Sequence, residues 1–265
     1  MNYHRHFPAE TTASLFRIPS LLLRRVVAVL VLTVALGEGG MMPAWAFKLT
    51  PMKMTLAPSG RGANGVFTVS NDSNDTLAVD VHVLSRRMTE DGVEVNEVVE
   101  NQFMVFPPQF ALKPKSVQTI RVRWLGREPV QKELAFRLVA EQLPVSLSRE
   151  ASGGVELNVA LRYLAAVYVR PKGVSPEVSL AVVGETRSSE PYVELLFENS
   201  GTRHVFMENL SLDLSCGGET VVVSGGLLER IAGENLLAGA RRRFRLAWPK
   251  GLPLGKPKGA FTFDR

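Results

Sequence analysis

The residues that could do chemistry are few, and they do not fall into catalytic or metal-binding patterns. Beyond residue 46 the sequence has two histidines, His82 and His204, and one cysteine, Cys216. No His-x-His, Glu-x-x-His or Cys-x-x-Cys spacing occurs in this part, so the usual metal-binding motifs are missing. Cys216 stands between Ser215 and two glycines, which favours a small buried residue over a thiol nucleophile. Neither a Gly-x-Ser-x-Gly elbow nor a phosphate-binding loop is present.

Carboxylate side chains also form no recognisable acid–base pair. Glu97 and Glu100 lie close together in the sequence, as do Glu90 and Asp91, but both pairs fall in turn-rich, polar stretches. Such stretches are typical of solvated loops rather than of the shielded sites that tune carboxyl groups for catalysis. We therefore expect a protein that is not an enzyme and that uses no metal and no cofactor. The alternative that the protein is a hydrolase, with a carboxylate pair of an unfamiliar pattern, stays open.

The first 46 residues are typical of a secretory signal peptide. Arginines at positions 17, 24 and 25 precede Val26–Leu36, a run of eleven residues that are all apolar except Thr33. A membrane-spanning helix needs about 20 apolar residues, so this run is too short to be one. The Ala44-Trp45-Ala46 sequence then matches a cleavage site. We expect cleavage after Ala46, export, and no stable membrane insertion of the processed chain.

Charge and cysteine content limit the kinds of partner and the kinds of fold that the protein can have. The full sequence has 31 Lys and Arg against 26 Asp and Glu, and the expected signal peptide contains four of the basic and two of the acidic residues, which leaves a net charge of +3. Outside Arg241–Arg243 the basic residues are dispersed, so we expect no nucleic-acid partner. A single cysteine cannot form an internal disulfide, so an exported chain must be stable through its hydrophobic cores.

The remaining sequence predicts short strands almost throughout. Turn signals separate the strands, and no convincing amphipathic helix of ten residues occurs; Leu227–Leu237 comes nearest, but Gly233 interrupts it. The expected strands are Val66–Val69, Thr76–Leu84, Val117–Trp124, Leu134–Glu141, Glu177–Val183, Tyr192–Glu198, Val205–Leu214, Thr220–Val223, Arg243–Ala247 and Ala260–Phe263. This pattern favours an all-β protein with two immunoglobulin-like sandwiches in tandem. Two prolines and a glycine in 170–176 resemble a short linker, so we expect domains at 47–171 and 172–265.

One stretch, residues 153–171, carries more information than any other. Four aliphatic residues alternate with polar ones at its start, and a nearly continuous apolar run, Tyr163–Val169, follows. The alternation predicts a strand with one apolar face, and the run predicts burial on both faces. The four aliphatic residues are Val155, Leu157, Val159 and Leu161. Their apolar face must be covered either by the chain's own second sheet or by another protein, and the residues alone favour neither.

Several segments, taken in order, resemble the periplasmic pilus chaperones, the PapD-like family of two immunoglobulin-like domains. They cover most of residues 48–171: Val69-Ser70-Asn71-Asp72-Ser73, Phe106–Leu112 followed by Pro114, Val117–Trp124, Glu133–Leu138 with Leu143-Pro144, and Val167–Pro171. The unpaired cysteine and Leu252–Gly255 resemble the archaic or the spore-coat-U-like branch more than the P-pilus branch. The second half resembles the family less closely.

The resemblance implies a function in protein assembly. Pilus subunits of this family lack their last strand, and the chaperone lends them its own edge strand, a mode of binding known as donor-strand complementation. Val155, Leu157, Val159 and Leu161 would then be the donor residues, and the client would pass to an outer-membrane usher. The alternative is an exported adhesion or carbohydrate-binding module in which these four side chains face the protein's own core. Whether the free protein covers its strand by self-association stays open.

The resemblance also implies roles for individual residues. The family holds the client's terminal carboxylate with two basic residues, and the first position matches Lys53. The second falls on Ala166, so Arg162 is the nearest substitute, with a simple solvated arginine as the alternative. Glu133 and Arg170 match positions that bridge the two domains. The family's Pro-Pro segment suggests a cis peptide bond before Pro107.

Overall fold

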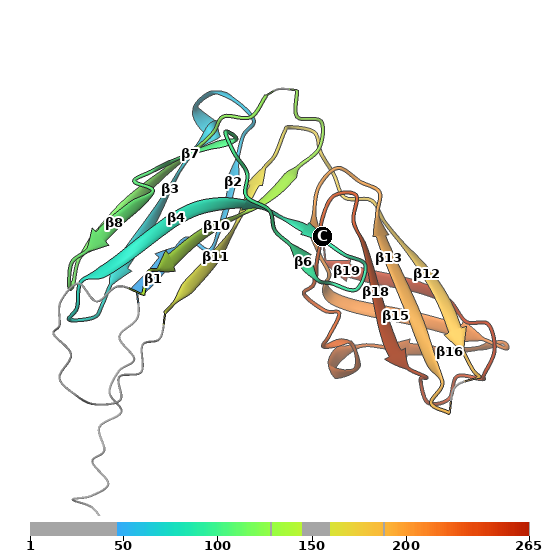
Figure 1. Ribbon diagram of the computed structural model, residues 1–265. Helices are drawn as coiled ribbons and strands as arrows, with labels where there is room; N and C mark the ends of the chain where they lie inside the picture. The colour runs from blue at the N-terminus through green and yellow to red at the C-terminus, as the bar shows by residue number, and fades with distance from the viewer. Residues whose placement is uncertain (1–46, 128, 145–159, 188, 265) are drawn as a thin grey trace, which may run out of the picture. The chain divides into compact units, whose positions relative to one another are not determined.

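The computed structural model describes residues 47–127, 129–144, 160–187 and 189–264 of the 265-residue chain. In this part the regular structure is β-strand apart from two short 3-10 turns, η1 (Gly60–Ala63) and η2 (Gly225–Leu228). The strands form two sandwiches, each with its own hydrophobic core (Figure 1). The expected all-β architecture of two immunoglobulin-like domains is confirmed. The expected signal peptide, 1–46, lies outside the described residues.

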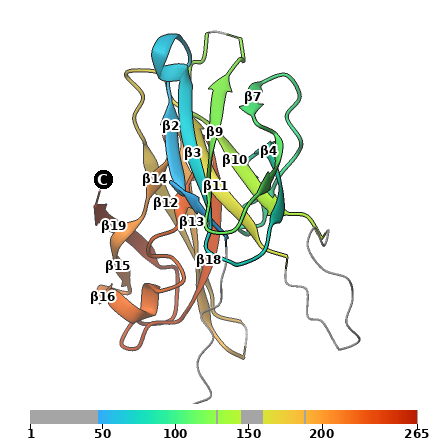
Figure 2. The same cartoon turned by 90° about the vertical axis from the view of Figure 1, so that its left-hand side faces the viewer.

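The first sandwich packs a four-stranded sheet against a five-stranded one. The four-stranded sheet has the order β1 (Phe47–Thr50), β3 (Asn64–Asn71), β9 (Val117–Trp124) and β7 (Phe103–Phe106). The five-stranded sheet has the order β2 (Lys53–Leu56), β11 (Arg162–Val169), β10 (Leu134–Gln142), β4 (Leu77–Ser85) and β8 (Gln109–Leu112). Figure 2 shows β3 and β9 side by side, in agreement with their antiparallel register.

Alternation along these strands builds the core of the first sandwich. In β9, Ile120, Val122 and Trp124 are buried while the residues between them are exposed. Phe67 of β3 and Leu138 of β10 are fully buried in the same core. The two-residue period of a strand with one covered face, which the sequence predicts for Val117–Trp124, is therefore the period that the structure uses.

The start of the chain takes part in both sheets. β1 pairs with β3 in one sheet, and β2 pairs with β11 in the other. The cis peptide bond Thr50–Pro51 connects them, and the Phe106–Pro107 bond is also cis. β2 is parallel to β11, with Lys53 opposite Ala166 and Leu56 opposite Val169. This crossing places a lysine beside the middle of β11.

The second sandwich is smaller. One sheet has the order β12 (Val178–Glu185), β13 (Tyr192–Asn199), β18 (Arg241–Ala247), and the other has β16 (Glu219–Val223), β15 (Glu208–Cys216), β19 (Lys258–Asp264). A short pair joins β14 (Val205–Phe206) to β17 (Asn235–Leu236). The segment 205–214, expected to be one strand, is divided at Met207, because Val205–Phe206 pairs with β17 while β15 pairs with β16 and β19. Within β15 the backbone also turns at Asn209, where φ is +52° and the β15–β19 register shifts.

A buried asparagine closes one end of the first sandwich. Asn71, the last residue of β3, is fully buried, and its side-chain nitrogen lies 2.8–3.1 Å from the carbonyl oxygens of Asp75, Leu112 and Lys113. Its side-chain oxygen accepts hydrogen bonds from the backbone nitrogen and the hydroxyl of Ser73, at 2.9 and 2.6 Å. One side chain therefore satisfies polar backbone groups from several loops that water does not reach.

The second sandwich repeats this device with Asn199, the last residue of β13. Asn199 is also fully buried, and its side-chain nitrogen reaches three carbonyl oxygens, those of Arg203, Leu236 and Leu237, at 2.8–3.2 Å. Its oxygen accepts hydrogen bonds from the backbone nitrogens of Glu177 and Gly201, both at 3.1 Å. The turn that Asn199 fixes leads directly to His204, which belongs to the site described below.

We expect Asn71→Ala to lower the free energy of unfolding of the first sandwich by about 3 kcal/mol, because it strands several buried polar backbone groups. Urea unfolding followed by tryptophan fluorescence measures this change. Asn74→Ala, at an exposed position three residues later, is the matched control and should change stability by less than about 0.5 kcal/mol. Equal unfolding midpoints for the two variants would contradict this account of Asn71.

Candidate functional site: an open strand edge and the polar junction beside it

Half of one edge of β11 has no partner strand. On one side, β10 pairs with β11 along its whole length, from Glu141 opposite Arg162 to Leu134 opposite Val169. On the other side, β2 pairs only with Ala166–Val169. Among the described residues, no strand pairs with that side of 162–165. The Leu164 carbonyl accepts a hydrogen bond from the Arg137 side chain at 3.3 Å. The other backbone groups along this edge are available to a strand from another molecule.

The inward side chains of β11 continue the apolar alternation of the preceding sequence. Ala165 and Val167 are fully buried, while Tyr163 and Leu161 are partly buried and pack against the first core. Leu161 is thus placed on the core-facing side at the start of the open edge. The other three expected donor residues, Val155, Leu157 and Val159, lie outside the described residues.

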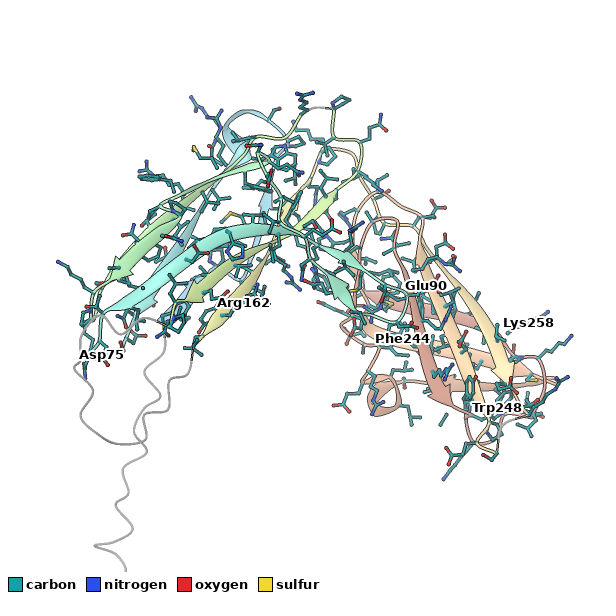
Figure 3. The ribbon with its side chains drawn as sticks, viewed as in Figure 1. Asp75, Glu90, Arg162, Phe244, Trp248 and Lys258 are labelled. Atoms are coloured by element: carbon teal, nitrogen blue, oxygen red, sulfur yellow. The ribbon has the colours of Figure 1, made fainter. Side chains whose placement is uncertain are left out.

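The two expected basic residues are placed differently. Lys53 is exposed and lies opposite Ala166, with its Nζ atom 5.3 Å from the centroid of the Phe206 ring. Arg162 lies at the other end of β11 (Figure 3) and forms an ion pair with Glu141 at 3.3 Å. Four residues of strand separate Arg162 from Ala166, about 13 Å. The structure therefore does not bring Arg162 and Lys53 together.

Glu133 is the centre of a buried polar junction. It is 5% exposed, and one carboxylate oxygen accepts a hydrogen bond from Nε of Arg170. The other oxygen accepts a hydrogen bond from the backbone nitrogen of His204 at 3.1 Å and also contacts the Nδ1 atom of that histidine. The His204 ring stacks on Tyr168, with centroids 4.0 Å apart. The structure thus brings Glu133 and Arg170 together and adds His204 from the second sandwich.

The electrostatics of Glu133 follow from this arrangement. Burial raises the pKa of the Glu133 carboxyl, but the hydrogen bonds from His204 and Arg170 outweigh burial, so that the pKa lies below its ordinary value of 4.5. The carboxylate is therefore ionised at neutral pH. Removing either partner would leave a buried charge poorly compensated.

A hairpin provides a second set of contacts. It consists of β5 (Arg87–Met88) and β6 (Glu94–Val95), and Glu90, at its tip (Figure 3), accepts a hydrogen bond from Arg243 of β18 at 2.6 Å. In β6, Glu94 accepts hydrogen bonds from Arg86 and Arg137 at 2.6–2.9 Å. Arg86 also donates to the hydroxyl of Tyr168 at 3.1 Å. The arginine cluster 241–243 thus serves, in part, to hold this hairpin.

Sequence reasoning missed His204 and this hairpin. His204 has no motif around it, and its burial depends on a partner 71 residues away, which local patterns do not report. In the described part of the chain, no group of three His, Cys, Asp or Glu residues is arranged to hold a metal ion. Cys216 is a buried free thiol at the end of β15. No described helix is long and apolar enough to cross a membrane.

Comparison with known proteins gives a class for this fold and site. Residues 48–175 match the family described as pili and flagellar-assembly chaperone, PapD N-terminal domain. This match spans the open edge, Lys53 and the Glu133–Arg170 pair. The first sandwich belongs to this family of PapD-like pilus chaperones. No curated protein sequence matches it.

Solved structures with a similar fold include proteins of pilus assembly. One is the CsuC–CsuE chaperone–tip adhesin complex of archaic Csu pili from Acinetobacter baumannii, at 15% identity and a TM-score of 0.55, covering 78% of this chain and 89% of the other. Another is the class 5 fimbriae chaperone CfaA, at 14% identity and a TM-score of 0.51, covering 83% of this chain and 100% of the other. At these identities the likeness shows the shared fold.

We expect Glu94→Gln to lower the stability of the first sandwich at neutral pH and to make that stability less dependent on pH. Burial raises the pKa of Glu94, but the hydrogen bond from Arg137 and the charges of Arg86 and Arg137 outweigh it and lower the pKa from 4.5 to about 2. The folded state thus favours the ionised form, and its stabilising effect is complete above pH 4.5 and disappears as the pH falls toward 2. Urea midpoints of the two proteins should therefore differ most at neutral pH and converge across this window.

Glu97→Gln is the control for this prediction, since the Glu97 carboxylate is 64% exposed in its pair with Arg87. Its midpoints should stay close to those of the unmodified protein at every pH. A constant gap between the Glu94→Gln variant and the unmodified protein from pH 7 to pH 3 would show that Glu94 stabilises the fold in some other way.

Proposed function

We propose that this chaperone works in the periplasm, where it binds pilus subunits by donor-strand complementation and delivers them to an outer-membrane usher. The observation that carries the proposal is the open edge at 162–165, which continues from a sequence with alternating aliphatic residues. The signal-like segment 1–46 supports export. The proposed domains are 47–171, which carries the donor strand, and 172–265.

Physical chemistry explains how such an edge could bind a client. A subunit that lacks a strand exposes unpaired backbone groups and an apolar groove, and an added strand satisfies both. We propose that Val155, Leu157, Val159 and Leu161 fill that groove. Burying one such side chain contributes roughly 1.5–3 kcal/mol, so four would hold a subunit firmly and still allow exchange.

The structural relatives support the kind of client. One is described as a chaperone–tip adhesin pre-assembly complex, and a second, at 13% identity and a TM-score of 0.50, as a chaperone–tip adhesin complex of CFA/I fimbriae, covering 82% of this chain and 98% of the other. We propose pilus subunits as the partners of this chain by analogy with those complexes. The position of Lys53 beside the open edge suits an anchor for a client's terminal carboxylate, and Arg162 is the second basic residue that the sequence offers.

We further propose that the Glu133 junction fixes the two sandwiches with respect to each other. Arg170, at the end of β11, and His204, in the second sandwich, both bind the same carboxylate. A client bound along β11 would then meet a defined surface on the second sandwich.

Delivery to an usher needs a second surface, and the outer face of the four-stranded sheet offers one. Val66, Met104, Phe106 and Val117 are between 46% and 64% exposed there. Cross-strand pairing places Arg121 between Val66 and Phe106, and Arg123 next to Met104. Among the described residues, the side chains on this face include the cations Lys48, Arg121 and Arg123 and no carboxylate. The full set is Lys48, Thr50, Asn64, Val66, Thr68, Ser70, Met104, Phe106, Val117, Thr119, Arg121 and Arg123. Such a surface fits an acidic segment with apolar side chains.

Capture of a subunit tests the donor strand. We expect co-expression with a pilus subunit encoded in the same gene cluster to yield a soluble one-to-one complex, measured by affinity co-purification and light scattering. The double variant Leu157→Glu, Val159→Glu should weaken capture by about 100-fold or more, because two apolar side chains of the donor face become charged. Asn158→Glu, at the alternate position, is the matched control and should retain capture.

Thermal unfolding of the free variants separates binding from folding. If the double variant unfolds in the absence of a subunit, those side chains belong to the protein's own core, and the donor-strand proposal is wrong. Failure of the unmodified protein to capture any subunit of its own gene cluster would favour the adhesion-module alternative.

Binding to the usher tests the outer face of the first sandwich. We expect Arg121→Glu with Arg123→Glu to weaken binding of the chaperone–subunit complex to the soluble part of the usher by about tenfold or more, since attraction becomes repulsion. Biolayer interferometry measures this affinity. Capture of the subunit should not change, and Lys258→Glu, on the exposed end of β19, should bind the usher normally. Unchanged usher binding by the double variant would exclude this face.

A further inference from the structure

β12 forms an edge of the second sandwich that no described strand covers. On one side, β13 pairs with β12 along its whole length, from Val178 opposite Asn199 to Glu185 opposite Tyr192, without a shift in register. Among the described residues, no strand pairs with the other side of β12. The backbone groups on that side of an eight-residue strand therefore have no partner within the sheet.

The sequence of this edge lacks the features that keep edge strands from pairing with other molecules. Such features are charged side chains, prolines, bulges and short length. The segment Val178–Gly184 contains no charged residue and no proline, and its side chains Ala181 and Val183 are exposed, Val183 at 62%.

The other edges of the second sandwich are better protected. β16 has only five residues, and β19 begins at Lys258 (Figure 3) and shifts its register with β15. The backbone of β18 donates a hydrogen bond to the tip of the β5–β6 hairpin, from Arg243 to the carbonyl of Glu90, at 2.7 Å. Of the edges in the described part of this sandwich, β12 is therefore the one most open to another strand.

The second core is also covered less completely at this edge than one strand further in. Leu180 and Val182 of β12 pack against the core but are only partly buried. Their partners on β13, Phe197 and Leu195, are fully buried. A strand added beside β12 would cover the open flank of Leu180 and Val182 and would satisfy the backbone groups at the same time.

Two charges of opposite sign lie at the two ends of this edge. Glu177 precedes β12 and Arg187 follows it, and both side chains are exposed. Within the described part of the chain neither side chain has an ion pair or a hydrogen bond, because the hydrogen bonds of both residues are made by their backbone. A strand that pairs here therefore meets a negative charge at one end and a positive charge at the other.

We propose that the partner of β12 is a second copy of this chain, paired antiparallel about a twofold axis. Because the same strand serves both copies, every contact in such a dimer occurs twice. One register brings Glu177 of each copy opposite Arg187 of the other and Ala181 opposite Val183. Sliding one copy by two residues, the smallest step that keeps the faces matched, either separates these charges or places Glu177 opposite Glu185. The charges at the ends therefore fit a second copy in one register.

The proposed dimer does not involve the open edge of β11. β12 lies in the second sandwich, whereas the expected donor strand belongs to the first. The proposal is therefore independent of the proposed function, and either can fail without the other.

Sedimentation velocity of the full processed protein tests this proposal. A single added strand pair is smaller than the interfaces of stable dimers, which bury about 1,200–2,000 Å². We therefore expect a reversible monomer–dimer equilibrium with a dissociation constant on the order of 10–100 µM, followed from roughly 5 to 500 µM protein.

Charge reversal identifies the strand and its register. Glu177→Arg and Arg187→Glu each place like charges opposite each other at both ends of the interface, and each should weaken the dimer by about tenfold or more. The double variant restores both opposite pairs and should dimerise like the unmodified protein. An equal mixture of the two single variants should form a heterodimer, because each copy then supplies the charge that the other needs.

Two further variants complete the test. Val183→Lys adds a charge in the middle of the interface at a position that is exposed in the monomer, so it should weaken the dimer by about tenfold or more and leave the monomer folded. Arg230→Glu, at an exposed position just after η2, is the matched control for Arg187→Glu and should dimerise normally.

Each outcome supports or overturns the proposal. A protein that stays monomeric up to about 500 µM contradicts it, since even a small interface of this kind should associate there. A dimer that Glu177→Arg and Val183→Lys leave unchanged is formed by another surface, and its loss in the Leu157→Glu, Val159→Glu variant would assign it to the donor strand. If the single reversals weaken the dimer and the double variant does not restore it, the register is wrong.

Discussion

The constraint on which this structure depends is that every backbone polar group of a sheet needs a partner. In the first sandwich β10 satisfies one side of β11 completely, while β2 satisfies only the last four residues of the other side. The shortness of β2 is therefore as important as the length of β11. Because the chain leaves β1, crosses to the other sheet through the Thr50–Pro51 bond and joins β11 only at Ala166, it covers the strand's root and leaves the rest of the edge open.

The same crossing determines where charge can act. β2 carries Lys53 to the place where an added strand has to end, so the lysine marks the end of the open edge whatever the client is. Ala166 on the neighbouring strand is covered by Leu237, and Tyr168 by the stacked ring of His204. Packing of the second sandwich on β11 thus decides which residues of the strand can meet a ligand.

Part of this could be predicted from sequence. The alternation in Val117–Trp124 predicts β9 because burial of one sheet face is a local property with a period of two residues. The family resemblance over residues 48–171 agrees with the family match over 48–175, because it depends on the order of local motifs. His204 could not be predicted, since its burial depends on Glu133, 71 residues away, and on the ring of Tyr168. The burial of Ala166 depends equally on distant residues, so sequence reasoning turned to the nearest basic residue on the same strand, Arg162, which the structure places beside Glu141.

Polar contacts at the junction have a further consequence for binding. Apolar packing alone would allow the sandwiches to slide, because dispersion contacts have little directional preference. The Glu133 carboxylate, by contrast, binds Arg170 and two nitrogen atoms of His204 in fixed directions. Glu94 likewise binds Arg137 and holds β6 of the hairpin whose tip reaches Arg243. Buried charged contacts of this kind require charged groups to be removed from water, which costs free energy. We infer that they are retained here because they fix geometry more than they add stability. Glu133 therefore holds Arg170 and His204 in a fixed arrangement, and loss of either contact would leave a buried charge poorly compensated.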